Sequence, residues 1–387
     1  MKNNNLHIVY LCNEYPPSKG GGVGTFTQTI ARQLVQLGCK VTVLGYYPVP
    51  VEVVEMDSGV QVIRMPVNLT PMLNIYINAI HLHKRLMQIH QLEPVHIIES
   101  SEMGFGALPR NTPGIKIIRM HGGHHFFSST LGRSPKRGRA MLEKNSFRKA
   151  DFLCAVSRFV ADTTRTLIKL ADRPIEIIPN PVDVDLFKPM PSILEEPGLI
   201  CFVGTICEKK GIRQLIEAMP EILDAIPQVH LVAIGRDGRD TQTGENYRIQ
   251  LQSRVPAKLQ DQIVFQGPVP HSDLPAWLAR SQVCVYPSHM EAMPIAWLEG
   301  LSMGKAVVAS QTGPGSELIE DGINGLLCNP YDAHSIAQKV IRILHDNKLR
   351  RELGKNARSS TVEKYSLTKI AELNLDYYHH CLTRETS

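Results

Sequence analysis

The chain has 387 residues, of which 43% are hydrophobic and 20% charged, and its formal net charge is +5. This composition is typical of a globular protein, and the length favours two domains. No stretch approaches the roughly 18 consecutive apolar residues of a membrane-spanning helix, which excludes an integral membrane protein. The first residues lead into a strand without an apolar leader or cleavage site, so we expect a cytoplasmic protein.

The charge is unevenly distributed. Residues 1–180 hold 21 Lys and Arg against 12 Asp and Glu, a net charge of +9, whereas residues 181–387 hold 21 against 25, a net charge of −4. The excess is concentrated in residues 131–149, which contain seven basic residues and one acid. A hydrated helix face and a patch for anionic lipid or a phosphorylated acceptor both fit this segment. A nucleic-acid ligand is disfavoured, because neither a known nucleic-acid-binding motif nor a group of aromatic residues for base stacking accompanies the basic residues.

Strand and helix signals alternate through the first half of the chain. The apolar run 6–12, a glycine-rich loop, the amphipathic segment 26–38 and the run 40–46 predict one β-α-β unit. Further strands are predicted, in chain order, at 60–66, 95–100, 116–122, 151–157 and 175–180. The proline-rich segment 179–198 is predicted to be a linker.

The same alternation restarts after residue 197. Strands are predicted at 199–205, 230–235, 262–268, 283–288, 306–310 and 325–329, with helices at 211–223, 271–281 and 294–304. Helical sequence from about residue 367 ends the chain. Short hydrophobic strands separated by helices predict parallel sheets covered on both faces, and such sheets bind ligands beyond the carboxyl ends of their strands.

The segment 291–299, EAMPIAWLE, places two carboxylates eight positions apart in an apolar surrounding. Pro294 suits the first turn of a helix, so Glu291 is predicted to lie in the preceding loop and Glu299 more than one turn inside. The free N–H groups near Met293 and Ile295 would attract an anion, phosphate above all. A capped helix with one acid at its entrance is the alternative explanation.

Four other motifs are weaker candidates for a functional site. The loop GGGVG (20–24) lacks the spacing of a dinucleotide fingerprint, and GLSMGKA (300–306) lacks the spacing and hydroxyl residue of a phosphate loop. The sequence DVD (183–185) fits a turn better than a metal site. The three histidines of HGGHH (121–125) lack a zinc-site context, and scattered cysteines without C-x-x-C disfavour a metal knuckle or a disulfide framework.

Taken together, the motifs resemble those of the family-4 retaining glycosyltransferases, whose fold is called GT-B. The similarity extends through nearly the whole chain. It rests on a collinear set: NEYPPSKGGGVGTF, RMHGG, AVS, IIPNPVDVDLF, FVGTICEKKG, PSHMEAMPIAWLEGLSMGKAVVAS and TGPGSELIEDGINGLL. The resemblance implies an α/β fold of two facing Rossmann-like, doubly wound domains with a cleft between them. Residues 1–180, completed by a C-terminal helix at 367–387, would bind the acceptor, and residues 181–366 would bind the nucleotide sugar.

The resemblance also implies roles for residues of the second domain. Glu299 matches the acid that accepts hydrogen bonds from the ribose hydroxyls, and Glu291 matches the acid that contacts the transferred sugar. The N–H groups of Met293 and Ile295 would bind the sugar or the diphosphate, and Lys210 would neutralise the diphosphate.

In the first domain, His121 matches the histidine that faces the donor sugar. The backbone of Gly21 and Gly22 matches the loop that closes over the phosphates. We place the acceptor near loops that carry Glu99, Glu102 and His124. Its identity, whether a glycan or a lipid-linked molecule, is not readable from the sequence.

One position departs from the family pattern. Thr205 stands where the family usually has arginine, so half of the charge that would bind the diphosphate with Lys210 is missing. Lys209 and Arg236 are candidates to replace it. This departure bears on donor affinity more than on reaction class.

The implied reaction is transfer of a sugar from a nucleotide diphosphate sugar with retention of configuration, without a metal or a tightly bound cofactor. Surface polysaccharide or glycoconjugate synthesis is the expected context. There are two alternatives. One is a non-catalytic nucleotide-sugar binding protein, because Thr205 replaces the expected arginine, and the other is a different GT-B enzyme such as an epimerase. A nicotinamide dehydrogenase is disfavoured by the failed glycine fingerprint. A cytoplasmic protein with peripheral contact to the inner membrane face is one hypothesis, and a soluble acceptor with hydrated charges is the other.

Overall fold

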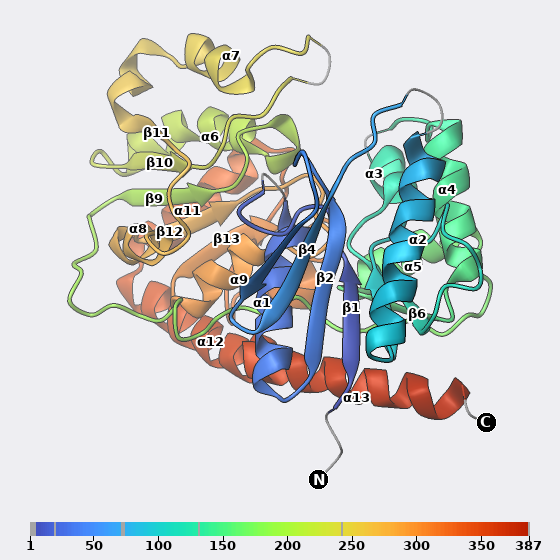
Figure 1. Ribbon diagram of the computed structural model, residues 1–387. Coiled ribbons are helices and arrows are strands. Elements are labelled where there is room, and N and C mark those ends of the chain that lie inside the picture. Colours follow the sequence, from blue (N-terminus) through green and yellow to red (C-terminus); the bar gives the residue numbers. More distant parts are fainter. Residues whose placement is uncertain (1–4, 19–20, 71–73, 131, 241–242, 386–387) are drawn as a thin grey trace. The chain divides into compact units, whose positions relative to one another are not determined.

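The computed structural model describes residues 5–18, 21–70, 74–130, 132–240 and 243–385 (Figure 1). The chain divides into two compact units: unit 1 consists of Met1–Pro181 and Leu367–Ser387, and unit 2 consists of Val182–Ser366. Each unit has its own sheet and its own hydrophobic core. No helix within the described ranges is long and apolar enough to cross a membrane.

Unit 1 is built on an eight-stranded sheet. Its strands pair in parallel, except that β3 is antiparallel to β4. Across the sheet the order is β3 (Val53–Asp57), β4 (Val60–Pro66), β2 (Lys40–Tyr47), β1 (His7–Leu11), β5 (Ile97–Ser100), β6 (Ile115–Met120), β7 (Phe152–Ala155) and β8 (Glu176–Ile177). The sequence did not predict β3, an edge strand that has no buried residue.

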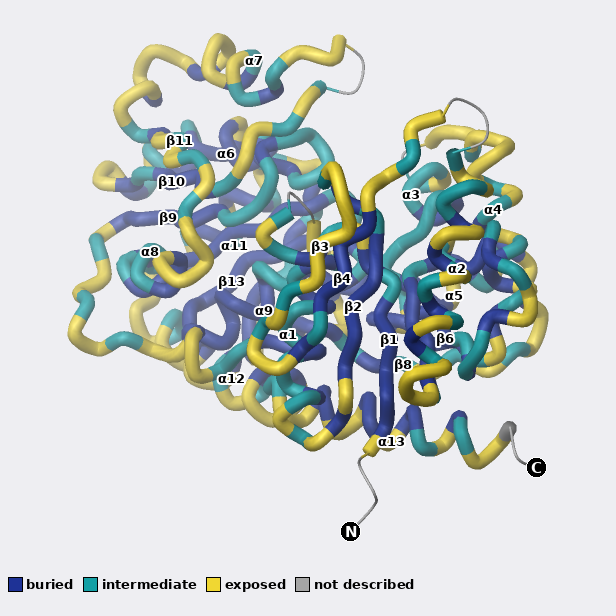
Figure 2. Tube along the Cα trace, in the orientation of Figure 1, coloured by how far each residue is buried: buried dark blue, intermediate teal, exposed yellow. Residues whose placement is uncertain are grey.

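Helices cover both faces of this sheet, as the alternation of buried side chains requires. The helices are α1 (Gly22–Gln36), α2 (Asn74–Leu92), α3 (His124–Thr130), α4 (Arg137–Lys149), α5 (Arg158–Ile168) and α13 (Leu367–Glu385). Ile8 and Tyr10 of β1 share a core with α1 and α13, and Val9 on the opposite face is equally buried. Almost the whole of β1 is buried (Figure 2). The hydroxyls of Tyr10 and Tyr378 lie 2.8 Å apart and attach α13 to the sheet.

Unit 2 contains a six-stranded sheet in which all neighbours are parallel. Its order is β11 (Ile263–Gly267), β10 (His230–Ile234), β9 (Leu199–Val203), β12 (Val283–Tyr286), β13 (Ala306–Ser310) and β14 (Leu326–Cys328). Numbered within the unit, this order is 3-2-1-4-5-6, which is that of a Rossmann fold. The order reverses between β9 and β12, and ligands bind at such a switch point.

The helices of unit 2 pack on this sheet and enclose its core. They are η1 (Glu208–Lys210), α6 (Ile212–Ala225), α7 (Tyr247–Arg254), η2 (Ala257–Gln262), α8 (Leu274–Arg280), α9 (Ile295–Ser302), α10 (Gly315–Leu318), α11 (Ala333–His345) and α12 (Asn347–Tyr365). The α/β class with two parallel sheets is therefore confirmed. The turn predicted at DVD is also present, because Asp183 Oδ1 accepts hydrogen bonds from the N–H groups of Asp185 and Leu186.

Candidate functional site

Two loops meet at the switch point of the unit 2 sheet. One follows β9 and leads through Thr205 into η1, and the other follows β12 and leads to Glu291. Gly211 allows their close approach: its φ is 70°, and a Cβ atom there would lie 1.8 Å from the carbonyl oxygen of Pro287. The predicted donor-binding residues of both loops are thus carried by the strand ends where a Rossmann sheet binds ligands.

Lys210 and Glu291 form an ion pair across these loops, from Lys210 Nζ to Glu291 Oε1. The Glu291 residue is only 7% exposed. Burial by itself would raise the pKa of Glu291, but the charges of Lys210 and Lys209 outweigh it and lower the pKa below its usual value. Glu291 is therefore an ionised carboxylate beside two positive charges at neutral pH.

Helix α9 begins directly after this pair. Pro294 is its N-cap residue, and Ile295 is the first helical residue, so the expected place of proline within the first turn is wrong by one position. The first turn carries no acid that would neutralise the positive end of the helix dipole. Glu299 lies more than one turn inside, 5% exposed, as the spacing predicted.

Glu299 has a partner that the sequence did not suggest. Its Oε1 atom lies 2.6 Å from Nε2 of His271, which is on the segment between β11 and α8. The hydrogen bond to Glu299 raises the pKa of His271 in spite of partial burial. The sequence predicts only that His271 begins a helix, and no local pattern indicates a contact with a residue 28 positions away.

Thr205 lies half-buried in the loop after β9. The next residue, Ile206, donates its backbone N–H to the carbonyl oxygen of Arg236 at 2.9 Å, so the backbone at Arg236 lies beside this loop. Lys209 is on the same loop, and burial lowers the pKa of its amine. Both candidates for replacing the expected arginine are therefore close to Thr205. Lys209 is close along the chain, and the backbone of Arg236 is hydrogen-bonded to the neighbouring Ile206.

In unit 1, His121 follows β6 and contacts Phe26 of α1. The two ring centroids are 4.8 Å apart, and the guanidinium of Arg119 lies over the Phe26 ring, 4.9 Å from its centroid. Burial and the charge of Arg119 lower the pKa of His121 to about 3, so its imidazole is neutral at physiological pH. Gly21 is the N-cap of α1, and its N–H donates to Glu14 Oε2 at 2.8 Å.

The three residues expected near the acceptor lie in different surroundings. Glu99 belongs to β5 rather than to a loop, and its buried carboxylate pairs with Arg119 at 2.7 Å and accepts from Tyr378 at 2.8 Å. Glu102 is buried, and this burial raises its pKa to about 8. His124 begins α3, where its Nε2 accepts the N–H of Lys136.

Within the described residues, no cluster of three or more His, Cys, Asp or Glu side chains is suited to hold a metal ion. The histidines of HGGHH have different partners. His121 contacts Phe26, whereas His125 pairs with the buried Glu143.

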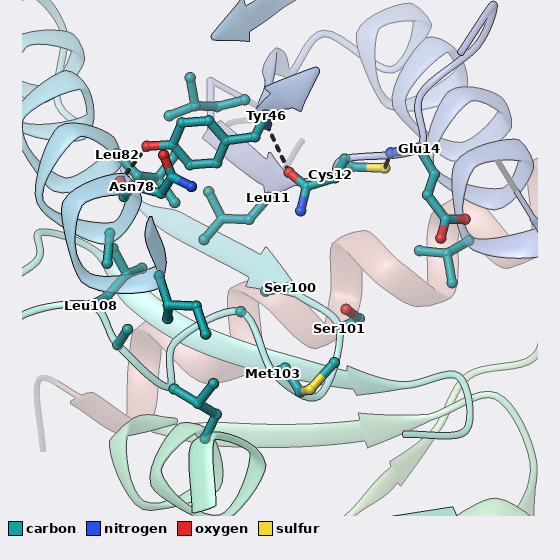
Figure 3. A pocket seen from close by; sticks show the side chains of 18 residues that line it. Leu11, Cys12, Glu14, Tyr46, Asn78, Leu82, Ser100, Ser101, Met103 and Leu108 are labelled. Atoms are coloured by element: carbon teal, nitrogen blue, oxygen red, sulfur yellow. Dashed lines mark hydrogen bonds between the residues drawn. The ribbon is translucent and has the colours of Figure 1, made fainter. Parts of the chain in front are cut away.

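Unit 1 also contains a cavity of about 390 Å³ (Figure 3). It opens at the carboxyl ends of β1 and β5, where the strand order of this sheet reverses. It is lined by Leu11, Cys12, Asn13, Glu14, Val23, Leu44, Tyr46, Ile75, Asn78, Ala79, Leu82, Ser100, Ser101, Met103, Gly104, Ala107, Leu108 and Leu142. The sequence did not predict this cavity, although the polar pair Asn13–Glu14, which begins two residues beyond the end of β1, was a usable signal.

Both units match known glycosyltransferases, and these matches together with the fold define a GT-B glycosyltransferase. Residues 20–186 match the model described as Glycosyltransferase Family 4, and residues 184–360 match the model described as Glycosyl transferases group 1. The chain belongs to this glycosyltransferase family.

Individual proteins resemble the chain over almost its full length. A GDP-mannose-dependent alpha-(1-6)-phosphatidylinositol monomannoside mannosyltransferase from Mycolicibacterium smegmatis is 26% identical, over 95% of this chain and 97% of that protein. Sucrose-phosphate synthase from Thermosynechococcus elongatus has a TM-score of 0.83 at 22% identity, covering 98% of this chain and 100% of that one. Anabaena HepE in complex with UDP-glucose has a TM-score of 0.74 at 18% identity, covering 97% and 100%.

Proposed function

We propose that the protein transfers a sugar from a nucleotide diphosphate sugar to a hydroxyl group of a glycan or lipid-linked acceptor, with retention of the anomeric configuration. We place this reaction in the synthesis of a surface polysaccharide or glycoconjugate. The observation that carries the proposal is the pairing of Lys210 with Glu291 beside the N-terminus of α9. The pair brings together Lys210, whose positive charge suits a diphosphate, and Glu291, whose carboxylate suits sugar hydroxyls. Both lie at strand ends where this fold binds ligands.

Each role is the one that the family resemblance implies, and it agrees with the charge and position of the residue. Lys210, with the N–H groups of Met293 and Ile295, holds the diphosphate, since cations and helix N-termini bind phosphate. Glu291 binds hydroxyls of the transferred sugar, and Glu299 binds the ribose. Thr205 lies on the loop that leads to Lys210, and we assign it to the diphosphate as well.

Unit 1 supplies the remaining groups. The backbone of Gly21 and Gly22 at the start of α1 binds the phosphates, and for this the Gly21 N–H has to exchange Glu14 Oε2 for a phosphate oxygen. His121 is neutral, so its ring can accept or donate a hydrogen bond to the sugar without adding charge. We assign the cavity of unit 1 to the acceptor.

The reaction breaks the bond between the anomeric carbon and the diphosphate oxygen and forms a bond from that carbon to the acceptor oxygen. The proton of the acceptor hydroxyl passes to the departing phosphate oxygen, and the nucleoside diphosphate leaves. Lys210 and the helix N-terminus stabilise the charge that develops on the leaving group, which is usually the largest catalytic contribution. Glu291 and Glu299 act as binding groups rather than as an acid/base pair.

A thermal-shift panel of nucleotide sugars tests donor binding, because a ligand at 100 times its Kd stabilises a protein by about 2.7 kcal/mol. NMR of the product then reports the anomeric configuration. An inverted product would refute retention. We expect no metal requirement, so activity should survive EDTA, and a complete loss that Mg²⁺ restores would contradict this expectation.

Thr205 favours a second candidate, a nucleotide-sugar binding protein without turnover, because the charge expected at this position is missing. An epimerase on the same fold is a third. Product analysis separates all three: a transferase makes a new glycoside, an epimerase changes the donor, and a binding protein does neither.

We also place the acceptor domain at an anionic membrane surface. Arg133, Lys136, Arg137 and Arg139 are exposed at or before the start of α4, and Met141 adjoins them with 60% of its surface exposed. Leu142 of the same helix lines the cavity. Basic side chains with an exposed apolar neighbour suit a surface of anionic lipid, and here they lie on the helix that borders the acceptor cavity.

A further inference from the structure

The cavity of unit 1 is positioned as a ligand site by the topology of its sheet. β1 and β5 are neighbours, and the chain runs outward from them in opposite directions. The loops after these strands supply Asn13 and Glu14 on one side and Ser101 on the other. A volume of about 390 Å³ is within the range of small-molecule pockets.

One end of the cavity offers hydrogen bonds that suit hydroxyl groups. Asn13 Oδ1 accepts the N–H of Tyr46 at 2.8 Å, so its amide nitrogen remains without a partner among the described residues. Glu14 uses Oε2 for Gly21, and its Oε1 remains for a ligand. The Ser101 hydroxyl also has no partner within the described part of the chain. An amide donor, a carboxylate oxygen and a hydroxyl together match the donors and acceptors of a sugar.

The same cavity is poorly suited to an anion. None of its described lining residues is Lys, Arg or His, and Glu14 is the charged residue among them. The N–H of Gly21, at the start of α1, is already occupied by Glu14. A phosphate or carboxylate would lose its hydration without gaining an opposite charge, and it would meet the negative charge of Glu14.

The other end of the cavity is apolar. Leu82 of α2 and Leu108 lie there with the ring of Tyr46, on the side away from Glu14 (Figure 3). The polar atoms at this end are already paired: the Tyr46 hydroxyl donates to the carbonyl oxygen of Asn78, and the side chain of Asn78 pairs with the backbone of Asn68. Hydroxyl groups of a ligand placed at this end would find no free hydrogen-bond partner among the described lining residues. An alkyl group would instead be stabilised there by its removal from water.

From this polarity we infer that the acceptor is an uncharged amphiphilic glycoside. Its sugar hydroxyls bind Asn13, Glu14 and Ser101, and an apolar aglycone lies against Leu82 and Leu108. The inference rests on the proposed function, because it names the substrate class of the cavity that we assign to the acceptor.

Ligand-observed NMR titration of the full chain tests the inference with three probes below any micelle-forming concentration. These are octyl β-D-glucopyranoside, methyl β-D-glucopyranoside and glucose 1-phosphate. A saturating nucleoside diphosphate is present throughout, so that the proposed donor site is occupied and the probes report on the cavity. We expect the octyl glycoside to bind at least tenfold more tightly than the methyl glycoside, since burying about two methylene groups is sufficient for that factor. Glucose 1-phosphate should bind more weakly than either.

Variants connect these affinities to the cavity. Leu82→Asn should weaken binding of the octyl glycoside fivefold or more and leave the methyl glycoside nearly unchanged. Ile80→Asn, on the same helix but outside the cavity lining, is the matched control and should change neither. Glu14→Gln should narrow the preference for methyl glycoside over glucose 1-phosphate severalfold. Retained helical circular dichroism shows that each variant is folded.

The inference is overturned if glucose 1-phosphate binds as tightly as the methyl glycoside, if the octyl chain adds no affinity, or if Ile80→Asn and Leu82→Asn behave alike. Nucleotide-sugar binding, measured on the same protein without the added nucleoside diphosphate, keeps the two proposals apart. Donor binding without glycoside binding refutes the acceptor class alone, whereas absence of donor binding refutes the proposed function.

Discussion

The imidazole of His271 and the carboxylate of Glu299 lie 2.6 Å apart, and they come from different elements of unit 2. Glu299 is almost fully buried on α9, whereas the side chain of His271 is about half exposed. The ring of Phe187 packs on His271 with centroids 5.0 Å apart and orients it. His271 thus occupies one oxygen of the carboxylate that we propose as the ribose ligand.

The first prediction concerns pH. The pKa of His271 is raised, so its imidazolium is favoured by the fold, and this contribution to stability is present below the unfolded pKa and lost as pH rises through the folded value. A ribose must compete with that imidazolium for Glu299. We expect nucleotide affinity to increase as pH rises through the pKa of His271.

Isothermal titration calorimetry with a nucleoside diphosphate between pH 5.5 and 8.5 measures this dependence. His271→Gln is the control, because it keeps a hydrogen-bond donor without a titration. The difference between the two profiles of nucleotide affinity against pH should correspond to the loss of one proton. Superimposable profiles would refute the competition between His271 and the ribose for Glu299.

The second prediction separates the two acids of α9 and its entrance loop. Glu299→Ala should weaken nucleotide binding tenfold or more, because a hydrogen bond to a charged group contributes about 1.5–3 kcal/mol. Glu291→Ala should mainly reduce turnover of the complete sugar donor. Calorimetry with the nucleotide and kinetics with the donor measure these effects. Equal nucleotide affinity in wild type and Glu299→Ala would remove the ribose assignment.

The third prediction concerns the diphosphate. Lys210→Ala should nearly abolish transfer, because the leaving group loses its cation and Glu291 loses its partner. Thr205→Arg should increase donor affinity, since it adds a second charge to the same loop. Steady-state kinetics and donor titration measure both, with thermal stability as a check of folding. Wild-type rates in Lys210→Ala would place the phosphate site elsewhere.

The sequence predicted the strands well because buried parallel strands are continuous apolar runs. The segment 60–66 coincides with β4, and 306–310 coincides with β13. It did not predict β3, whose pairing with β4 depends on the neighbouring strand rather than on a buried face of its own. The segment 291–299 indicated Glu291, and the resemblance added Lys210. Their ion pair was not predicted, because no local pattern connects positions 81 residues apart.

Tertiary contacts limited the prediction of the acceptor side. Glu99 lies next to the end of the predicted strand 95–100, and we expected it on a loop near the acceptor. Instead it pairs with Arg119 in the core, and Tyr378 of the C-terminal helix donates to it. Tyr46 and Asn78 line the cavity from separate elements, so the cavity could not be assembled from sequence spacing.

The fourth prediction uses Glu102, whose burial and proximity to Glu143 raise its pKa to about 8. Its neutral carboxyl is favoured in the folded state. The stability it contributes is therefore complete below pH 4.5 and is lost as pH rises to about 8. Glu102→Gln, which is neutral throughout, should become more stable than wild type over this window, by at most about 1.4 kcal/mol per pH unit. Urea unfolding at pH 5, 6.5 and 8 measures it. A stability difference that does not change with pH would show that Glu102 is ionised in the fold.

The last prediction concerns the exposed basic side chains of α4 and the segment before it. Each Lys or Arg near an anionic membrane contributes about 1 kcal/mol, so several together suffice for reversible binding. We expect co-sedimentation with liposomes that contain anionic lipid, at low salt, and little with neutral liposomes. Replacing Lys136, Arg137 and Arg139 by serine should reduce the bound fraction strongly.

A matched control replaces three exposed basic residues of α12 in unit 2, Lys348, Arg351 and Lys355, by serine. It removes the same charge from a different surface. Because long-range attraction depends on net charge whereas docking depends on position, only the α4 variant should lose binding. Equal losses of liposome binding in both variants would show that the interaction depends on the net charge of the protein and not on the position of the basic residues. Absence of binding by the wild type at low salt would favour a soluble acceptor and hydrated charges.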